Sequence, residues 1–306
     1  MTVVHTVPDP PVPNTWTVLS LLQWSTAYLA ARGFDEARLH VELILGHVLS
    51  LKRLSLYLQF DRPLTAGELT AFKALFKRRL DREPLQYILG ETEFMGLTLT
   101  VGPGVLIPRP ETELLVEAAA VLVRATGKEH VDVLDVGTGS GCIAFGLARL
   151  TPQVSVLGID NSPAALGIAR KNLERYPDLR VVFEIQDVRT ASWSPSSFDI
   201  VVSNPPYIPP GDLDELEPEV RVHEPRPALT DEADGLSFYA VLFATGRQVL
   251  RNGGGMVCEI GHGQEDAVRS MAPRHGMHVR EVIPDLAGIP RVVVAVRVPD
   301  SQEGAA

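Results

Sequence analysis

Residues 198–208 read Phe-Asp-Ile-Val-Val-Ser-Asn-Pro-Pro-Tyr-Ile. The apolar, β-branched run over 198–203 is typical of a buried strand in a parallel sheet. Two consecutive prolines then end the strand, because neither can donate a backbone hydrogen bond and each restricts the residue before it. Asn204 is therefore expected at the carboxyl end of a strand, with Tyr207 close behind. Open α/β sheets bind their ligands at that edge.

The turn formed by residues 204–207 offers hydrogen-bond acceptors without matching donors. Asn204 carries a side-chain carbonyl, and Pro205 and Pro206 supply main-chain carbonyls but no N–H. A planar NH2 group could donate both of its hydrogens here while its flat face rests on the Tyr207 ring. Such a site suits a nitrogen that is a poor nucleophile and gains positive charge as it reacts. The alternative interpretation is a proline-rich turn that only ends a core strand.

Strands and helices alternate from residue 110 onward, which indicates a parallel sheet with helices on both faces. Only the turn-rich segment 284–288 separates the last two strands, and it is too short for a helical crossover, so they should pair antiparallel. The predicted fold class is α/β, with a Rossmann-like, seven-stranded, mostly parallel sheet that ends in an antiparallel hairpin. The expected strands are 131–136, 154–159, 181–185, 198–203, 255–260, 279–283 and 291–298.

Residues 15–85 are predicted to form a small all-helical domain. Its first apolar stripe stops at Gly33, and Asp35 is expected to cap the second helix. Thr65 and Glu68 have the spacing of a capping box that opens a later helix. This segment shows no catalytic constellation, so we expect it to bind or position a substrate protein.

The remaining segments are predicted as a connector, a catalytic domain and two tails. Residues 86–109 are expected to connect the domains and to contain a short hairpin with Gly96 at its turn, or alternatively a bulged strand. The catalytic domain is expected over 110–298. Residues 1–14 and 299–306 are predicted to be disordered tails, because they lack hydrophobic periodicity.

Composition excludes several classes of protein. A chain of 306 residues is long enough for two domains with real cores, and its net charge of −10 argues against a broad nucleic-acid footprint or an anionic membrane surface. That charge is compatible with a basic protein partner.

Cys142 and Cys258 lie in apolar settings, which indicates buried thiols without a disulfide framework. The sequence has no apolar run near the ~20 residues of a membrane span, no secretory signal and no metal-ligand spacing of histidines. We expect a cytoplasmic, monomeric protein without a metal.

A glycine-rich turn follows the first strand of the predicted sheet. Residues 135–141 read Asp-Val-Gly-Thr-Gly-Ser-Gly, and the glycines allow close approach of a ligand and positive φ. A dinucleotide fingerprint would have a third glycine at position 142, where this chain has Cys142. Asp160 ends the next strand, where an acid can bind a ribose diol. Asp187 ends the third strand, where an acceptor could meet an adenine amine.

A nucleoside without phosphates fits these three strand ends better than a dinucleotide does. S-adenosylmethionine fits best, because its positively charged sulfonium tolerates an acidic rim formed by Asp135 and Asp160. A tight structural turn remains the alternative interpretation of the glycines alone. The candidate cofactor-binding residues at these strand ends are Gly137, Gly139, Asp160 and Asp187.

These residues bring the chain close to a known family. Residues 110–298 resemble class I S-adenosylmethionine-dependent methyltransferases that carry an Asn-Pro-Pro-Tyr amino-methylation motif. The wider pattern resembles the peptide chain release factor glutamine methyltransferases, the PrmC/HemK family, over residues 16–298. The segments that carry this resemblance are 82–90 (Arg-Glu-Pro-Leu-Gln-Tyr-Ile-Leu-Gly), 94–96 (Phe-Met-Gly), 105–113 (Val-Leu-Ile-Pro-Arg-Pro-Glu-Thr-Glu), 224–229 (Glu-Pro-Arg-Pro-Ala-Leu) and 259–261 (Glu-Ile-Gly).

The resemblance implies an activity, a partner and a set of site residues. The family methylates the side-chain nitrogen N5 of the glutamine in the Gly-Gly-Gln loop of class-1 release factors. By position, the residues that would hold the cofactor are Gly137, Thr138, Gly139, Ser140, Gly141 and Asp160, with Asp187 near its adenine and Asn204 also facing it. Asn204, Pro205, Pro206 and Tyr207 would bind the substrate glutamine, and Asn204, Pro205 and Tyr207 would be catalytic. The chain departs from the family at Val188, where an aromatic residue often lies beside the adenine.

Three questions stay open at this point. An adenine-N6 methyltransferase acting on DNA or RNA is one alternative, because a flipped adenine amine presents the same NH2 geometry, although no basic recognition domain is visible. A binding module without catalysis is another. The acidic residues after the Asn-Pro-Pro-Tyr motif form either a solvated loop or a surface that steers a basic release factor. They are Asp212, Asp214, Glu215, Glu217 and Glu219.

Overall fold

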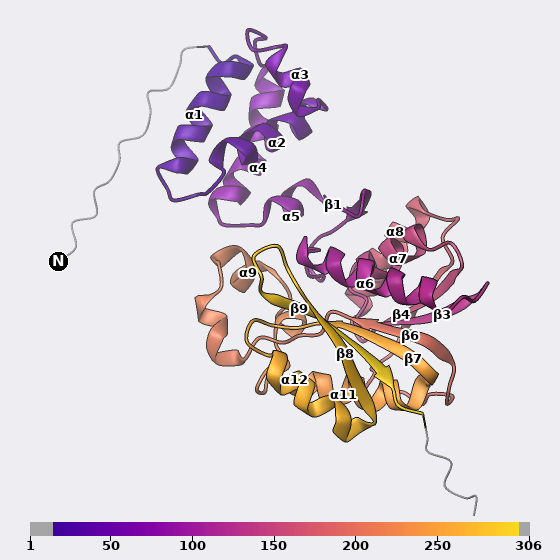
Figure 1. Ribbon diagram of the computed structural model, residues 1–306. Coiled ribbons are helices and arrows are strands. Elements are labelled where there is room, and N and C mark those ends of the chain that lie inside the picture. Colours follow the sequence, from indigo (N-terminus) through magenta and orange to yellow (C-terminus); the bar gives the residue numbers. More distant parts are fainter. Residues whose placement is uncertain (1–14, 300–306) are drawn as a thin grey trace, which may run out of the picture. The chain divides into compact units, whose positions relative to one another are not determined.

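The computed structural model describes residues 15–299, which form two compact units that meet between Leu89 and Gly90 (Figure 1). The predicted tail 1–14 and residues 300–306 of the second predicted tail lie outside the described residues. The division between the units falls inside the segment 86–109, which the sequence suggested as a connector.

The N-terminal unit is helical and has its own apolar core, to which Phe72 and Phe76 of its longest helix contribute. The capping box is confirmed, since the Thr65 hydroxyl accepts from the Glu68 N–H at 3.2 Å and the Glu68 carboxylate accepts from the Thr65 N–H at 2.8 Å. The cap predicted at Asp35 is wrong, because Glu36 holds that position with left-handed backbone and no side-chain cap. The helices are α1 (Val18–Ala30), α2 (Ala37–Leu49), α3 (Arg53–Tyr57), α4 (Ala66–Leu80) and α5 (Leu85–Leu89).

The second unit opens with the predicted hairpin. Strands β1 (Glu91–Phe94) and β2 (Leu97–Thr100) pair antiparallel around a turn at Met95 and Gly96, so this prediction is confirmed. The side chain of Asn172 accepts from the Thr100 N–H at 2.6 Å, which fastens the hairpin to the helix that carries Asn172.

The sheet of the second unit has seven strands in the order β5-β4-β3-β6-β7-β9-β8. The strands from β5 to β7 run parallel, whereas β9 pairs antiparallel with both β7 and β8. The predicted α/β sheet with its antiparallel final hairpin is therefore confirmed. The strands are β3 (Val131–Val136), β4 (Val154–Asp160), β5 (Val181–Ile185), β6 (Phe198–Ser203), β7 (Leu250–Glu259), β8 (Met277–Pro284) and β9 (Pro290–Arg297).

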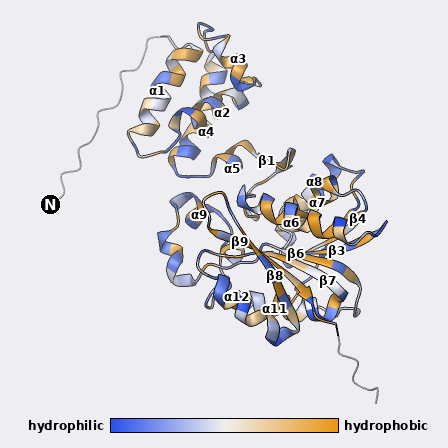
Figure 2. Ribbon diagram, viewed as in Figure 1, coloured by the Kyte–Doolittle hydropathy of each residue, from blue (hydrophilic) through white to orange (hydrophobic). Residues whose placement is uncertain are grey.

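Helices cover both faces of this sheet. One face packs against α6 (Glu111–Ala125), α7 (Cys142–Leu150) and α8 (Pro163–Arg175), and the other against α11 (Ser237–Val249) and α12 (Glu265–Met271). Side chains alternate between the two layers, so that Val133 faces the first and Leu134 the second. Figure 2 shows hydrophobic residues along the strands at the centre of the sheet, as expected for parallel strands buried on both faces. A 3-10 turn, η2 (Ala272–His275), follows α12.

The amino ends of the parallel strands are tied together by charge. Asp199 of β6 is only 4% exposed and accepts from the Lys128 ammonium at 2.5 Å and from Arg251 at 2.7 Å. Its other contact is the N–H of Asp132 in β3, at 3.0 Å. Burial works against the charged carboxylate, but these contacts outweigh it and lower the pKa of Asp199. Every acceptor oxygen of this buried group is therefore partnered.

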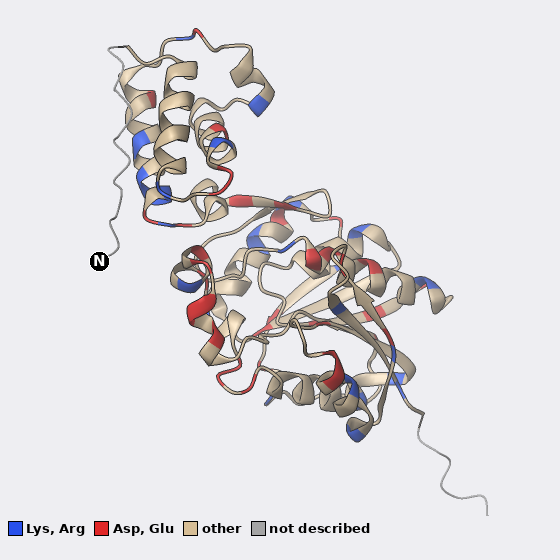
Figure 3. Cartoon of the chain, turned by 60° about the vertical axis from the view of Figure 1, so that its left-hand side comes forward, with Lys and Arg blue, Asp and Glu red and all other residues tan. Residues whose placement is uncertain are grey.

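The segment between β6 and α11 is made of short helical turns. They are η1 (Pro210–Glu215), α9 (Pro218–His223) and α10 (Arg226–Leu229). Acidic positions are frequent from η1 to α9, and Figure 3 marks them in red. None of the helices in the described part of the chain is both long and apolar enough to span a bilayer.

Candidate active site

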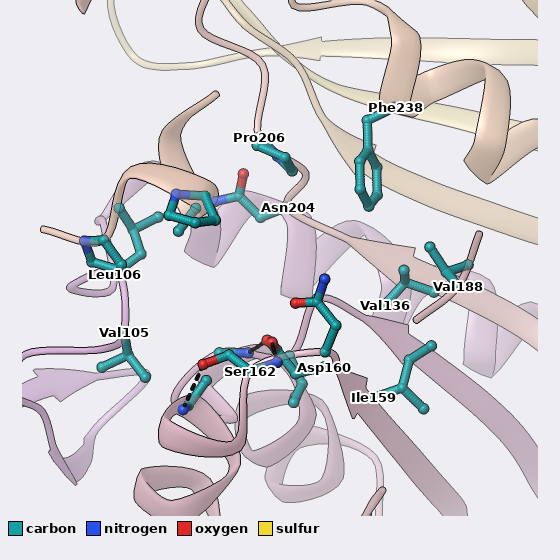
Figure 4. Close-up of a pocket in the computed structure, with 18 of the residues that line it drawn as sticks. Val105, Leu106, Val136, Ile159, Asp160, Ser162, Val188, Asn204, Pro206 and Phe238 are labelled. Carbon is teal, nitrogen blue, oxygen red and sulfur yellow. Dashed lines mark hydrogen bonds between the residues drawn. The ribbon is translucent and has the colours of Figure 1, made fainter. Parts of the chain in front are cut away.

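The carboxyl ends of β3, β4, β5 and β6 open into one cleft of about 490 Å³ in the second unit (Figure 4). Its wall includes the glycine turn after β3, Asp160 at the end of β4, Asp187 after β5 and Asn204 after β6. The structure thus brings together groups from four strand ends that are separated along the chain. Of the predicted site residues, Gly141, Pro205 and Tyr207 are not among those that line this cleft.

The glycines of the turn have different roles. Gly137 has φ of 72°, and a Cβ built there would meet no atom within 4 Å, so its backbone lies bare on the cleft. Gly141 instead packs under the turn, because a Cβ there would lie 2.6 Å from the Phe145 ring. An uncovered main chain at the first position is what a closely approaching ligand requires.

Asp160 is fixed against the glycine turn. One carboxylate oxygen accepts from the Gly139 N–H at 3.0 Å and the other from the Ser162 N–H at 2.9 Å. Burial raises the pKa of this carboxyl. A carboxylate has about four acceptor positions, so Asp160 keeps capacity to accept from a ribose hydroxyl.

Asp135 lies beneath the turn, and its expected place on the rim is wrong, since it is fully buried. Its Oδ2 accepts from the Thr138 hydroxyl at 2.6 Å, whereas its Oδ1 makes no hydrogen bond of good geometry within the described residues. Burial, helped by the nearby charge of Asp160, raises the pKa of Asp135 to about 7. A buried carboxylate with an unpartnered oxygen favours a positively charged ligand nearby, so these residues fit S-adenosylmethionine.

Asp187 carries a partner that the sequence did not suggest. Arg189 donates to both oxygens of its carboxylate, with its Nη2 at 2.8 Å from Oδ2 and its Nε at 3.0 Å from Oδ1. This hydrogen-bonded pair lowers the pKa of Asp187. The carboxylate is therefore charged and still lines the cleft, and its predicted contact with an adenine amine stays a prediction.

The end of the cleft beside Asp187 is apolar. Val136, Ile159 and Val188 line it, and the aromatic ring that the sequence lacks at position 188 is supplied by Phe238 of α11 (Figure 4). Phe238 follows the ordinary apolar pattern of a helix that packs on a sheet. For that reason no motif in the sequence marked it as part of the site.

Asn204 and Pro206 lie across the cleft from Asp160 and Ser162 (Figure 4). Tyr207 faces away, and its hydroxyl donates to the Glu259 carboxylate at 3.2 Å. Its ring packs against the core on the α11 side of the sheet and borders a second cavity of about 400 Å³. The sequence interpretation of this ring as a platform inside the cleft therefore does not match the described geometry.

Gln264 holds the main chain of the turn from behind. Its Nε2 donates to the carbonyl oxygens of Tyr207 at 2.9 Å and Gly235 at 3.1 Å. Its Oε1 accepts from the Gly261 N–H and from the Tyr239 hydroxyl, both at 2.9 Å. All the hydrogen-bonding positions of this carboxamide are used.

Two residues to which the sequence gave no role lie directly behind Asn204. The Asn204 Nδ2 donates to the Thr112 hydroxyl at 3.2 Å, and that hydroxyl donates to the Glu259 carboxylate at 2.7 Å. Glu259 is 2% exposed, and burial raises its pKa. Both residues belong to segments that carry the family resemblance, which was the one available signal.

A buried ion pair joins two walls of the cleft. Glu224, which is 6% exposed, accepts from Arg109 at 2.5 Å and from the Ile107 N–H at 3.1 Å. The segment that precedes α6 is thereby fastened to the segment that precedes α10, and both line the cleft.

Known proteins share sequence with most of this chain. A sequence profile described as the PrmC N-terminal domain matches residues 20–90, and one described as a methyltransferase domain matches residues 127–262. The release factor glutamine methyltransferase of Geobacter sulfurreducens is 44% identical over 287 residues, which cover 92% of this chain and 97% of that protein. The enzyme of the same name from Chlorobaculum tepidum is 44% identical over 82% of this chain and 87% of its own length. A solved structure of a release factor-specific protein-(glutamine-N5) methyltransferase from Alicyclobacillus acidocaldarius is 35% identical, with a TM-score of 0.39 over 66% of this chain and 100% of that chain.

Proposed function

The chain belongs to the release factor glutamine methyltransferase family, and on that basis we propose that it methylates a glutamine side chain of a peptide chain release factor. The methyl group comes from S-adenosylmethionine, and the acceptor is the amide nitrogen N5. The family resemblance implies the glutamine of the Gly-Gly-Gln loop in class-1 release factors. The observation that carries the proposal is the single cleft shared by the glycine turn and Asn204.

Each part of the cofactor has a matching part of the cleft. The bare main chain at Gly137 admits close approach, Asp160 offers acceptors to a ribose, and the apolar end with Phe238 suits an adenine ring. The buried carboxyl of Asp135 favours the positive charge of the sulfonium compound. When bound, S-adenosylmethionine supplies a methyl group on a positively charged sulfur. As the lone pair of the acceptor nitrogen forms the new C–N bond, the S–CH3 bond breaks and the sulfur becomes a neutral thioether.

The protein must make a weakly nucleophilic amide nitrogen react. That nitrogen shares its lone pair with the carbonyl, and full loss of the resonance costs on the order of 18–20 kcal/mol, judged from the peptide rotation barrier. The side-chain carbonyl of Asn204, which lines the cleft, stabilises the positive charge that develops on nitrogen, which is oxyanion-hole stabilisation with the sign reversed. The predicted role of the Pro205 carbonyl is not part of this proposal, because Pro205 does not line the cleft. Holding the two reactants in the right orientation in one cleft lowers the activation barrier by roughly 7–11 kcal/mol. The nitrogen then loses its extra proton to water, so no general base is required.

Methyl transfer to a purified release factor tests the proposal. The protein is incubated with isotopically labelled S-adenosylmethionine and a class-1 release factor, and the modified residue is mapped by mass spectrometry. We expect one methyl group on the glutamine of the Gly-Gly-Gln loop. Transfer to a DNA or RNA duplex offered as a control, or no transfer to the release factor, would overturn the proposal.

We further propose that the protein acts as a monomer in the cytoplasm and that its helical N-terminal unit binds the substrate protein. Light scattering of the active enzyme during size-exclusion chromatography tests the monomeric state. Substitutions on the surface of the N-terminal unit test the second point. We expect them to abolish methyl transfer to the intact release factor while cofactor binding is retained.

A further inference from the structure

We propose that Thr112 and Glu259 are positioning residues that hold the Asn204 amide with its NH2 toward the protein and its carbonyl oxygen available to the substrate. This inference rests on the proposed function, because it assigns Asn204 Oδ1 as the acceptor for the substrate carboxamide. Neither residue needs to touch the reacting atoms.

The direction of each hydrogen bond follows from the donors available. The Thr112 hydroxyl has one hydrogen, and an ionised carboxylate can only accept, so that hydrogen is committed to Glu259 at 2.7 Å. Toward Asn204 the hydroxyl can then only accept, and Nδ2 lies 3.2 Å away. A flipped amide would set Oδ1 against the lone pairs of the hydroxyl, which is repulsive. The network therefore determines the orientation of the Asn204 amide.

Three elements bring these side chains together. Strands β6 and β7 are parallel neighbours in which Ser203 pairs with Cys258, so Asn204 and Glu259 follow at matching positions. Thr112 enters from the first turn of α6. The second oxygen of Glu259 accepts from the Tyr207 hydroxyl at 3.2 Å. The buried Glu259 carboxylate is thus linked to both ends of the Asn-Pro-Pro-Tyr turn, to Asn204 through Thr112 and to Tyr207 directly.

The orientation leaves one acceptor free. Asn204 lines the cleft, and among the hydrogen bonds described for residues 15–299 its side chain takes part as the donor to Thr112, with Oδ1 not engaged. A free acceptor at this place can receive a hydrogen from a substrate NH2. The opposite orientation would present a donor to a donor and would disfavour the same substrate.

The arrangement requires Glu259 to be ionised. If Glu259 binds a proton, its O–H can donate to Thr112, whose own hydrogen is then free to donate to Asn204 Oδ1 and to stabilise the flipped amide. Burial raises the pKa of Glu259, so this change occurs at a higher pH than for an ordinary glutamate. The titratable or charged groups that face Glu259 from its neighbours are Glu111, Cys142, Tyr207, Tyr239, Cys258 and Arg291.

A matched pair of variants tests the role of the hydroxyl. Thr112→Val removes the hydroxyl at nearly constant shape, and Thr112→Ser keeps it. We expect Thr112→Val to lower kcat on the release factor about 10- to 100-fold through misplacement of the acceptor. Affinity for S-adenosylmethionine and the melting temperature are measured in parallel, and Thr112→Ser should recover most of the lost kcat.

A second measurement observes the amide without any turnover. The chain has five asparagines, so the side-chain NH2 signals of protein labelled with 15N-asparagine can be resolved and that of position 204 identified with Asn204→Ala. We expect this signal to move in Thr112→Val and to stay in Thr112→Ser. In the wild-type protein it should also move as the pH falls through the pKa of Glu259, and this pH response should be absent in Glu259→Gln.

The outcomes separate the inference from the proposed function. A wild-type protein that does not methylate the release factor overturns the function, while the asparagine signals still decide the inference. Normal kcat in Thr112→Val, equal losses in the valine and serine variants, or an Asn204 signal that ignores Thr112→Val would each overturn the inference.

Discussion

Asn204 is the residue on which the proposed chemistry depends most directly. Replacing it with alanine removes the acceptor oxygen but leaves the glycine turn, Asp160 and the apolar end of the cleft in place. We expect turnover to fall by about 10²–10³-fold, the usual loss when one preorganised polar group is removed from an active site. Affinity for S-adenosylmethionine, measured by calorimetry, should change little. Near-normal turnover would remove Asn204 from the mechanism.

Asp135 makes the stability of the protein depend on pH. Burial raises its pKa to about 7 in the folded state, so between its ordinary pKa and pH 7 the folded protein binds more protons than the unfolded chain. The stability that it contributes is therefore complete at acid pH and is lost as the pH rises through about 7. In Asp135→Asn this loss should be absent. Urea unfolding of both proteins at intervals from about pH 4 to 8 measures the difference, and a wild-type stability that rises relative to the variant would contradict it.

Single residues also show where sequence interpretation reaches its limit. Asp160, Asp187 and Asn204 could be placed in one site because parallel strands deliver their carboxyl ends to one edge. Thr112 could not, since its hydroxyl bond to Glu259 joins positions 147 residues apart along the chain. The Arg189 contact that holds Asp187 depends on side-chain direction, which no spacing rule gives.

At the scale of elements, the charge cluster around Asp199 should stabilise the amino edge of the sheet. Arg251→Met leaves a nearly buried carboxylate oxygen without its cation, and we expect the free energy of unfolding to fall by about 1–3 kcal/mol. Arg269→Met is the control, because the Arg269–Glu265 pair on α12 is exposed and such pairs contribute only about 0–1 kcal/mol. Chemical denaturation of both variants makes the comparison. Equal losses would show that burial of Asp199 has no effect.

The elements themselves were largely predictable. Buried parallel strands are nearly continuous apolar runs, so their centres are evident from the sequence alone. The start of β7 could not be predicted. Leu250 already pairs with Phe198, five residues before the predicted strand begins, and the glycine-rich residues that follow Leu250 lack the apolar pattern of a strand. The cap at Glu36 was missed because it uses left-handed backbone rather than a side-chain acceptor.

At the scale of the whole molecule, the net charge of −10 and the acidic stretch from η1 to α9 predict electrostatic attraction of a basic partner protein toward this stretch. Replacing Asp212, Asp214, Glu215 and Glu217 by their amides should lower kcat/KM for the release factor and flatten its dependence on salt, because long-range attraction is screened by ions. Cofactor affinity is the control and should not change. If the wild-type rate is already insensitive to salt, the segment is a solvated loop.

The complete use of Gln264's hydrogen-bonding positions has a consequence for an enzyme that modifies carboxamides. This glutamine lies just behind the reactive turn, yet both hydrogens of its nitrogen are given to carbonyl oxygens, and it borders the second cavity instead of the cleft. We therefore expect that the Gln264 nitrogen cannot reach the methyl group of the cofactor and that the protein does not methylate itself at this residue. Peptide mapping after prolonged storage with the methyl donor alone should find residue 264 unaltered, and a mass increase of one CH2 at that peptide would contradict this expectation.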